Sequence, residues 1–423
     1  MKQMIKILNC KNKNYKKKLV KFLDKRRSRK SIDTIFISKI LNNFKKNKLK
    51  AVIKYERLFS KNSKIYASKN EINATIKKLD SKTRRAIDFA YSRIYRFHSL
   101  QKPKDIKFID KYKNKIDYKN VPLQSVGIYV PSNLPSTLLM CAIPAQISKV
   151  KKIIVANPRT NGKLNSAVMY AAKKCGVTEV ITCGGAQAIG NLAYIQKVNK
   201  VIGPGSDITA EAKKLVYGVV GIDSLAGPSE ILVLADKKTN INEIGTSLVG
   251  QSEHSPESQC ILVTKNKEII NKVEKNISEN LKNLPRKKIA LQSLKKHGLI
   301  VVCQNDKQIV DVINECASEH IELNVLNYKK YINNIVNAGS ICIGKYTPMA
   351  VTDYNSGTQH TLPTLGSSKY SSGLNLNDFY KKISYVKLSK KGVAKIGKFA
   401  IHLSDFENLK AHSKSIKSRI RRG

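Results

Sequence analysis

The chain has 423 residues, enough for two or three domains with separate cores, and its hydrophobic content of 41% is ordinary for a globular protein. Its charge is extreme, because 78 basic residues face 30 acidic ones and give a net charge of +48. Since the lysines are spread over nearly every segment, the sequence argues against nucleic-acid binding as the primary function.

Residues 1–120 are the most lysine-rich part of the chain and predict a helical N-terminal region. Over residues 35–53 and 72–94, apolar residues recur at three- and four-residue spacing with charges between them, as in amphipathic helices. We expect this region to pack on the second of the two lobes that follow.

From about residue 121 the pattern changes to short β-branched runs that alternate with helical ones. Strands are predicted at residues 126–130, 152–157, 179–183 and 200–202. Helices are predicted between them at residues 136–147, 163–174 and 186–194. This alternation indicates βαβ units and a parallel sheet covered on both faces, so residues 121–229 are predicted to form a first α/β lobe. The glycine-rich turns described below make it the candidate nucleotide-binding lobe.

A second alternating block predicts another α/β lobe over residues 230–375, which carries the metal and catalytic residues discussed below. Its strands are predicted at residues 230–235, 259–264, 299–303, 321–325 and 340–343, and its helices include 241–253 and 266–283. Residues 376–423 are predicted to form a basic helical tail without strands. The predicted fold class is therefore α/β, with two Rossmann-like parallel-sheet lobes and helical N- and C-terminal extensions.

No apolar stretch reaches the roughly 18 to 20 residues that a membrane helix needs. Lysines interrupt the N-terminus before a signal-like apolar core can form, so we expect a soluble, cytoplasmic protein without a membrane partner. The eight cysteines include no C-x-x-C pair, and several lie in apolar runs, which predicts buried thiols in a reducing compartment.

Four short polar clusters in the second half of the chain hold four of the seven histidines. They lie at residues 251–254, 318–320, 353–360 and 407–412. Imidazole, carboxylate and amide oxygen are ligands for zinc-like ions, and histidine beside glutamate moves protons near neutral pH. In a chain dominated by lysine, these clusters indicate an enzyme with a metal.

Within the clusters, Gln251 and His254 stand three residues apart at the end of a predicted helix and share a face, although a solvated helix end would show the same pattern. Asp353 and His360 enclose a turn-rich loop that could bring carboxylate and imidazole together. Histidines combined with an aspartate and an amide suit an open zinc site with room for substrate.

Glu319 and His320 are neighbours, so on a helix they would point about 100° apart and do different jobs. One could activate water while the other takes a proton from an alcohol. A salt-bridged surface pair is the alternative for this cluster taken alone. Glu407 and His412 lie five residues apart in the predicted C-terminal helical segment.

The first lobe has glycine-rich turns at predicted strand ends. Residues 183–190 follow a strand and open a helix, where backbone amides could bind a diphosphate, although a tight turn there requires glycine for its own geometry. Residues 203–206 and 226–230 form similar strand-end turns, where α/β proteins bind ligands.

These motifs resemble the histidinol dehydrogenase family over nearly the whole chain, best from residue 120 onward. The matching runs are VGIYVP (126–131), GGAQAIG (184–190), GPG (203–205), AGPSE (226–230), QSEHSPESQ (251–259), SEHIEL (318–323), DYNSGTQHTLPT (353–364) and ENLKAHSKSI (407–416). Several long motifs in the same order make the resemblance specific.

The resemblance implies oxidation of L-histidinol to L-histidine, the last steps of histidine biosynthesis, by two hydride transfers to NAD through an enzyme-held aldehyde. It implies one zinc ion per subunit, held by Gln251, His254, Asp353 and His412. The last ligand would come from the partner subunit of a homodimer with a shared active site. Glu319 would activate water for attack on the aldehyde, and His320 would deprotonate the alcohol.

The resemblance also implies binding residues. Substrate contacts fall at Ser229, Gln251, His254, His320, Asp353, His360, Glu407 and His412. NAD contacts fall at Tyr129, Gln187 and Ser206. Two departures affect the nucleotide side, because the loop at residues 131–136 is three residues shorter than usual in the family and Ser206 replaces an asparagine. We expect weaker NAD affinity rather than loss of activity, since the metal and base positions are intact.

Two other classes of function stay open at this point. A zinc hydrolase would use Glu319 to activate a water beside the metal and would need no nucleotide. A nucleic-acid-binding protein with a relict site would keep its RNA affinity at physiological salt, whereas loss of binding by about 200 mM salt would indicate bulk electrostatics.

Overall fold

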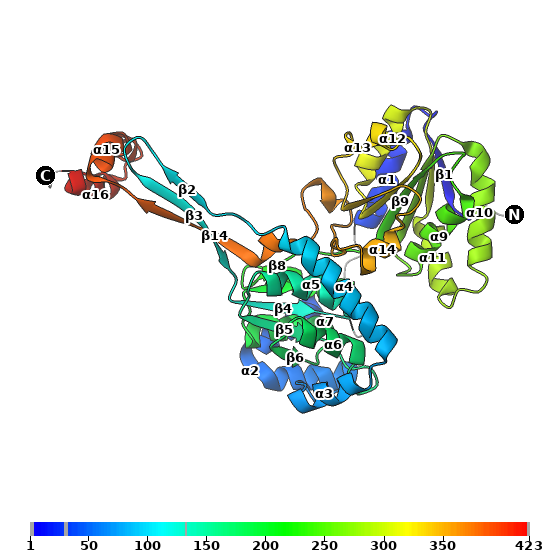
Figure 1. Ribbon diagram of the computed structural model, residues 1–423, viewed down its shortest axis with the longest axis horizontal. Helices are drawn as coiled ribbons and strands as arrows, with labels where there is room; N and C mark the ends of the chain where they lie inside the picture. Colours follow the sequence, from blue (N-terminus) through cyan, green and yellow to red (C-terminus); the bar gives the residue numbers. More distant parts are fainter. Residues whose placement is uncertain (1–3, 29–32, 132, 421–423) are drawn as a thin grey trace.

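The computed structural model describes residues 4–28, 33–131 and 133–420, which form two α/β lobes and a long projecting arm (Figure 1). The predicted α/β class with two parallel-sheet lobes is confirmed. Ser132, which belongs to the shortened loop, lies outside the described residues. The lobe boundaries expected at residues 229 and 375 stay predictions.

The first lobe contains a five-stranded parallel sheet in the order β6-β5-β4-β7-β8. Its strands are β4 (Ser125–Tyr129), β5 (Lys152–Ala156), β6 (Glu179–Ile181), β7 (Lys200–Ile202) and β8 (Gly221–Ile222). The connecting helices are α5 (Pro135–Ile147), α6 (Ser166–Lys174), α7 (Gly185–Gly190), the π-helix η1 (Asn191–Ile195) and α8 (Asp207–Val216). Of these strands, only β8 was not predicted, and it has just two residues, both half-buried.

Three helices of the N-terminal region complete this lobe, so the prediction that the region packs on the second lobe is wrong for most of its length. α2 (Thr34–Ser60) packs on α7, η1 and α8, whereas α3 (Lys69–Lys77) packs on α6 and α4 (Ser81–Ser99) packs on α5. The Phe44 ring of α2 packs directly against Gly190 of α7. Only glycine fits there, since a Cβ at this position would lie 2.2 Å from the ring. The short helices α7 and α8 leave apolar surface that α2 covers.

The helix predicted over residues 72–94 is in fact divided between α3 and α4. The first segment ends at Lys77, and Asp80 starts the second, because its side chain accepts a hydrogen bond from the Thr83 amide at 2.8 Å as an N-cap. The apolar spacing continues across this break, which is why the periodicity alone predicted one helix.

The second lobe contains a six-stranded parallel sheet in the order β1-β11-β10-β9-β12-β13. Its strands are β1 (Lys6–Asn9), β9 (Glu230–Ala235), β10 (Gln259–Thr264), β11 (Leu299–Val302), β12 (His320–Asn324) and β13 (Ser340–Ile343). Only β1 was not predicted. It comes from the N-terminus and extends the sheet at its edge, where Lys6 pairs with Leu299.

Helices cover both faces of this sheet. One face packs against α9 (Ile241–Ser252), α10 (Ile270–Asn280), α11 (Lys287–His297) and α14 (Met349–Tyr354). The other packs against α1 (Tyr15–Arg27), α12 (Asp306–Cys316) and α13 (Lys329–Ile332). Three single-turn helices complete the lobes, namely η2 (Lys267–Ile269), η3 (Ser367–Lys369) and η4 (Leu376–Phe379).

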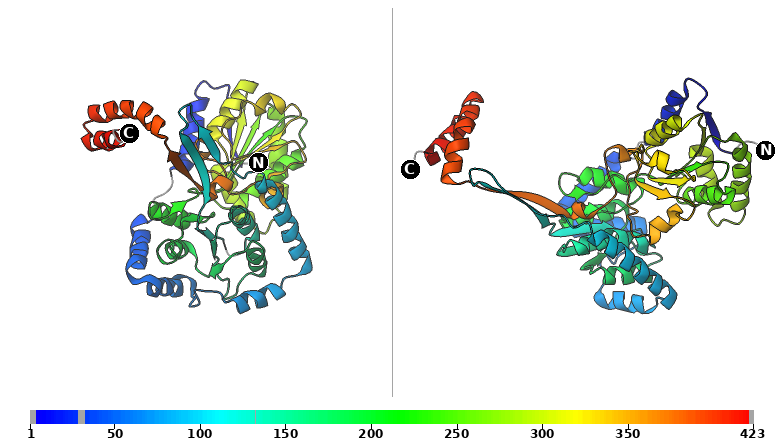
Figure 2. Two further views of the ribbon diagram at one scale, coloured as in Figure 1. Left: turned by 60° about the vertical axis from the view of Figure 1, so that its left-hand side comes forward. Right: turned by 45° about the horizontal axis from the view of Figure 1, so that its top comes forward.

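The arm projects away from both lobes in all three views (Figures 1 and 2). It is made of β2 (Ile106–Ile109), β3 (Lys115–Pro122), β14 (Tyr380–Lys387), α15 (Lys390–Phe406) and α16 (Lys410–Ile420). The prediction of a tail without strands is wrong, because β14 pairs antiparallel with β3 from Tyr380 opposite Pro122 to Lys387 opposite Lys115. No side chain of either strand is buried, so no apolar alternation marked them in the sequence.

The cysteines are all buried and free, as predicted. Among the helices of the described ranges, none combines the length and the hydrophobicity that crossing a bilayer requires.

Candidate active site

The predicted catalytic pair lies at the amino-terminal edge of the second sheet. Glu319 directly precedes β12, and His320 is the first residue of that strand. Both are buried. The turn at residues 226–230 leads into β9 at this same edge. It therefore lies at the amino end of a strand and not at the carboxyl end, where α/β sheets usually bind ligands.

Predicted site residues from separate segments meet around His320. Its Nε2 atom lies 3.5 Å from Oδ1 of Asp353 and 3.9 Å from Oε1 of Glu319. Asp353 belongs to α14, and the loop after α14 folds back so that Nδ1 of His360 lies 2.8 Å from the Asp353 carbonyl oxygen. The same loop contacts the first lobe, because Nε2 of the Gln359 side chain donates to the Met140 carbonyl oxygen at 2.8 Å. The cluster thus lies where the two lobes face each other.

Burial controls the protonation of these groups. Burial, together with the neighbouring histidines, lowers the pKa of His320 to about 3. Burial likewise lowers the pKa of His360 to about 4, so both imidazoles are neutral at pH 7. Burial raises the pKa of Asp353 to about 7 and that of Glu319 well above its usual range. A buried carboxylate such as Asp353 favours a cation beside it, because desolvation otherwise penalises its charged form.

The donor set fits a metal ion. Gln251 is buried at the end of α9, and its Oε1 atom has no hydrogen-bond partner. His254 is an exposed residue, yet desolvation of its imidazole lowers its pKa. In the described part of the chain, no three His, Cys, Asp or Glu side chains already stand in metal-binding geometry. An orphaned amide oxygen, a neutral imidazole and a carboxylate in need of a cation nevertheless match the ligands of an open zinc site.

Two predicted residues lie far from this cluster within one chain. Glu407 follows α15 and His412 lies in α16, at the tip of the arm (Figures 1 and 2). Both are exposed. The contact of α14 with α9 brings the segments of Gln251, His254 and Asp353 together, but one chain does not bring His412 to them.

Sequence reasoning missed two residues of the cluster, Arg26 and Glu230. The backbone amides of Glu230 and Glu319 each donate to the other's carboxylate, and Arg26 forms a buried ion pair with Glu230. Ser229, a predicted substrate contact, is half-buried beside them. The sequence contained a signal for Arg26, because it continues the helical spacing of Tyr15, Leu19 and Leu23, the other buried residues of α1. An arginine on an apolar helix face needs a buried partner.

The predicted NAD contacts lie at the carboxyl edge of the first sheet. Tyr129 ends β4, Gln187 is buried in α7, and Ser206 precedes α8. The Ser206 hydroxyl lies 3.3 Å from that of Thr209. Gly203 beside them has a φ of 113°, and a Cβ there would lie 2.2 Å from the Tyr129 carbonyl oxygen, so this turn requires glycine.

The glycine turn that opens α7 is less available to a diphosphate than expected. The Gly184 amide donates a hydrogen bond to the buried Glu56 carboxylate at 2.9 Å. This amide therefore already has an acceptor from the protein, and a second anion beside Glu56 would be repelled.

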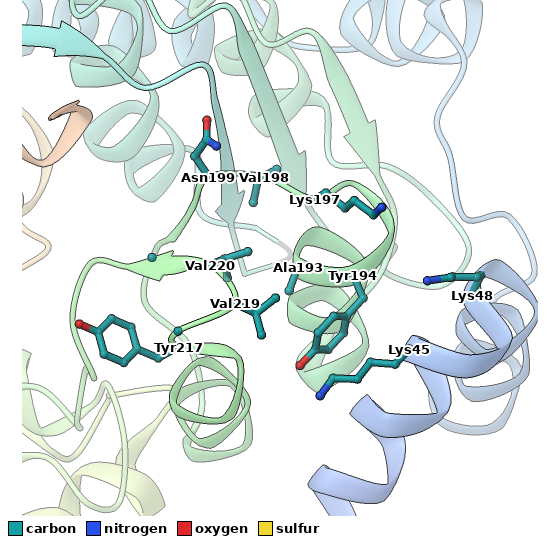
Figure 3. Close-up of a pocket in the computed structure, with 12 residues that line it drawn as sticks. Lys45, Lys48, Ala193, Tyr194, Lys197, Val198, Asn199, Tyr217, Val219 and Val220 are labelled. Carbon is teal, nitrogen blue, oxygen red and sulfur yellow. The ribbon is translucent and has the colours of Figure 1, made fainter. Parts of the chain in front are cut away.

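A cavity of about 550 Å³ in the first lobe lies elsewhere (Figure 3). Lys45, Tyr194, Lys197 and Tyr217 are among its lining residues, and it opens at the amino ends of β7 and β8. No predicted site residue lines it, so it is not the candidate active site.

Comparison with known proteins gives a consistent result. The chain matches the family model described as histidinol dehydrogenase over residues 24–420. It is 49% identical to the histidinol dehydrogenase of Pelagibacter ubique, over 99% of this chain and 100% of that protein. It is 38% identical to the histidinol dehydrogenase of Caulobacter vibrioides, over 95% and 96% of the two chains. The crystal structure of histidinol dehydrogenase from Elizabethkingia anophelis matches with a TM-score of 0.93 and 32% identity, over 100% of this chain and 99% of that chain.

Proposed function

The chain belongs to the histidinol dehydrogenase family, a family of oxidoreductases, and we propose that it oxidises L-histidinol to L-histidine with NAD as the acceptor. The alcohol and NAD⁺ first give the aldehyde, NADH and one proton. The aldehyde, water and a second NAD⁺ then give the carboxylate, NADH and two protons. The observation that carries this proposal is the His320 cluster, where a neutral imidazole and a buried carboxylate lie side by side. Membership of this family argues against the zinc hydrolase and the nucleic-acid-binding protein.

His320 and Glu319 would carry the two proton transfers. His320 is neutral at pH 7, because its pKa is about 3, so a ring nitrogen can accept the proton of the alcohol as hydride leaves the carbon. Its Nδ1 atom is buried and has no hydrogen-bond partner. Glu319 would accept a proton from the water that attacks the aldehyde, and its raised pKa makes its carboxylate a stronger base.

Gln251, His254 and Asp353 would hold the zinc ion, with His412 of a second copy as the fourth protein ligand. The unpartnered Oε1 of Gln251 and the raised pKa of Asp353 support this assignment. When bound, zinc would bind and orient the imidazole and amine of histidinol, so that its contribution is positioning. Ser229, His360 and Glu407 would complete the substrate contacts.

Tyr129, Gln187 and Ser206 would bind NAD at the carboxyl edge of the first sheet, which faces the cluster. The small hydroxyl of Ser206 offers fewer hydrogen bonds than the family's usual asparagine, so we expect a raised KM for NAD.

We further propose a cytoplasmic homodimer in which each arm completes the other subunit's site. The arm exposes large apolar side chains. Among them, Phe108, Phe399 and Phe406 have solvent-exposed fractions of 53%, 66% and 81%. Such a surface suits a protein partner, and a second copy would supply both the partner and the missing His412.

The test is direct. Purified protein with zinc, L-histidinol and excess NAD should form two NADH per histidinol. Zero turnover under these conditions would reject the proposal, and activity without any nucleotide would favour a hydrolase.

A further inference from the structure

The Arg26 guanidinium, on an N-terminal helix, connects two segments of the active site. Its side chain is 4% exposed, and it forms an ion pair with Oε1 of Glu230. It also donates to the carbonyl oxygens of Pro228 at 2.6 Å, Glu257 at 2.8 Å and Ser229 at 3.4 Å. The fork of one arginine thus joins the turn before β9 to the loop that follows His254.

Glu230 carries this constraint to Glu319. The Glu230 amide donates to Oε2 of Glu319 at 2.9 Å, and the Glu319 amide donates to Oε2 of Glu230 at 3.2 Å. The Leu365 amide donates to Oε1 of Glu230 at 2.9 Å. The Glu230 carboxylate thus binds the Glu319 backbone amide, and the Glu230 backbone amide binds the Glu319 carboxylate, so a shift of the Glu230 residue as a whole disturbs both bonds.

We propose that Arg26 is a positioning residue that acts through Glu230 to hold the Glu319 carboxylate in the orientation required for the second oxidation. This inference rests on the proposed function, in which Glu319 activates the water that attacks the aldehyde. Lysine cannot replace the arginine, because a single ammonium group lacks the planar fork that reaches Glu230 and the three carbonyl oxygens at once.

The alternative is that the ion pair only stabilises the fold. Buried ion pairs are weak contributors to net stability, because desolvation offsets their attraction, whereas removal of one partner is costly. A stability measurement therefore does not separate the two roles. The ratio of the rates of the two NADH-forming steps separates the roles, since Glu319 takes part in the second step and not in the first.

The experiment follows NADH formation in a single turnover after rapid mixing of zinc-loaded, full-length enzyme and L-histidinol with excess NAD. In Arg26→Met, we expect the second step to slow by about 10-fold or more relative to the first, because a positioned base contributes on the order of 10²–10⁴-fold. If Arg26→Met fails to fold, Arg26→Lys decides, and we expect the same selective loss there. An unchanged ratio of the two steps in the folded variant overturns the inference.

Two further variants sharpen the test. Arg159→Met breaks another ion pair with a buried arginine, whose partner Glu71 lies in the first lobe, so any effect through NAD should slow both steps alike. Arg26→Met combined with Glu230→Gln should slow the second step no more than the worse single variant, because the two residues act in series. A selective second-step loss in Arg159→Met, or additive losses in the double variant, would contradict the inference. Wild-type enzyme without any NADH formation would instead reject the proposed function.

Discussion

Nε2 of His320 lies 3.5 Å from Oδ1 of Asp353, which places the proposed proton acceptor for the alcohol against a proposed zinc ligand. A change at either residue therefore alters both proton transfer and metal binding. Residues outside this contact separate the two roles, and the first three predictions use them.

His254→Ala should lose bound zinc. The imidazole of His254 lies in the segment beside Gln251, and a site with an open position for substrate has no protein ligand to spare. We expect the zinc content, measured by atomic absorption after gel filtration, to fall from one per subunit to well below half. The control is His402→Ala, because His402 is exposed on α15 and has no assigned role. Full zinc retention in His254→Ala would remove His254 from the ligand set.

Glu319→Gln should keep zinc and stall at the aldehyde. Glutamine preserves the shape of the side chain but cannot accept a proton from water, so the second oxidation should slow by about 10²-fold or more. We expect close to one NADH per histidinol within the time in which wild-type enzyme forms two. Glu279→Gln, at an exposed position on α10, is the matched control and should form two. Wild-type stoichiometry in Glu319→Gln would assign water activation to another group.

Hybrid dimers should recover activity from two inactive variants. If His412 reaches the partner's site, a dimer of one His412→Ala chain and one Glu319→Gln chain contains one site with both residues intact. We expect up to about a quarter of wild-type activity after subunit exchange, because half of the dimers are hybrid and each has one working site. Exchange is checked by mass spectrometry of differently tagged chains. No recovery after confirmed exchange would mean that the site is not shared.

Glu56→Gln should raise the stability of the protein relative to wild type, and this difference should grow as pH rises. Burial raises the pKa of Glu56 above the ordinary glutamate value of 4.5, so the folded state holds the proton more tightly than the unfolded state. The stability from this proton is present below pH 4.5 and is lost as pH rises through the folded pKa. Glutamine keeps an oxygen for the Gly184 amide and cannot ionise. Unfolding midpoints in urea, compared between about pH 5 and 8, should therefore favour Glu56→Gln increasingly toward pH 8.

Glu71→Gln is the control of opposite sign. The hydrogen bond from Arg159 lowers the pKa of Glu71, so its carboxylate contributes stability above pH 4.5 that is lost as pH falls. Glutamine at residue 71 should therefore destabilise the protein at pH 7. A pH-independent difference between Glu56→Gln and wild type would show that Glu56 has no raised pKa.

Much of each lobe could be predicted, because buried parallel strands are short continuous apolar runs. β9 and β10 match their predicted ranges at both ends. β1 and β14 could not be predicted, since each is recognised only by its pairing partner, Leu299–Val302 for the first and Lys115–Pro122 for the second. α2 was predicted as a helix, but its sequence does not show on which lobe it packs. That choice depends on Gly190, whose missing side chain leaves room for the Phe44 ring.

The sequence by itself determined the alternation of strands and helices and the chemistry-bearing clusters, because local periodicity and residue type are properties of neighbours in the chain. Only the tertiary structure decided that Arg26 pairs with Glu230, that Glu56 occupies the Gly184 amide, and that His412 lies on an arm away from its own lobes. The physical reason is that a buried charge or amide is satisfied by whichever group the packing brings to it. That choice depends on the three-dimensional arrangement of segments far apart in the sequence.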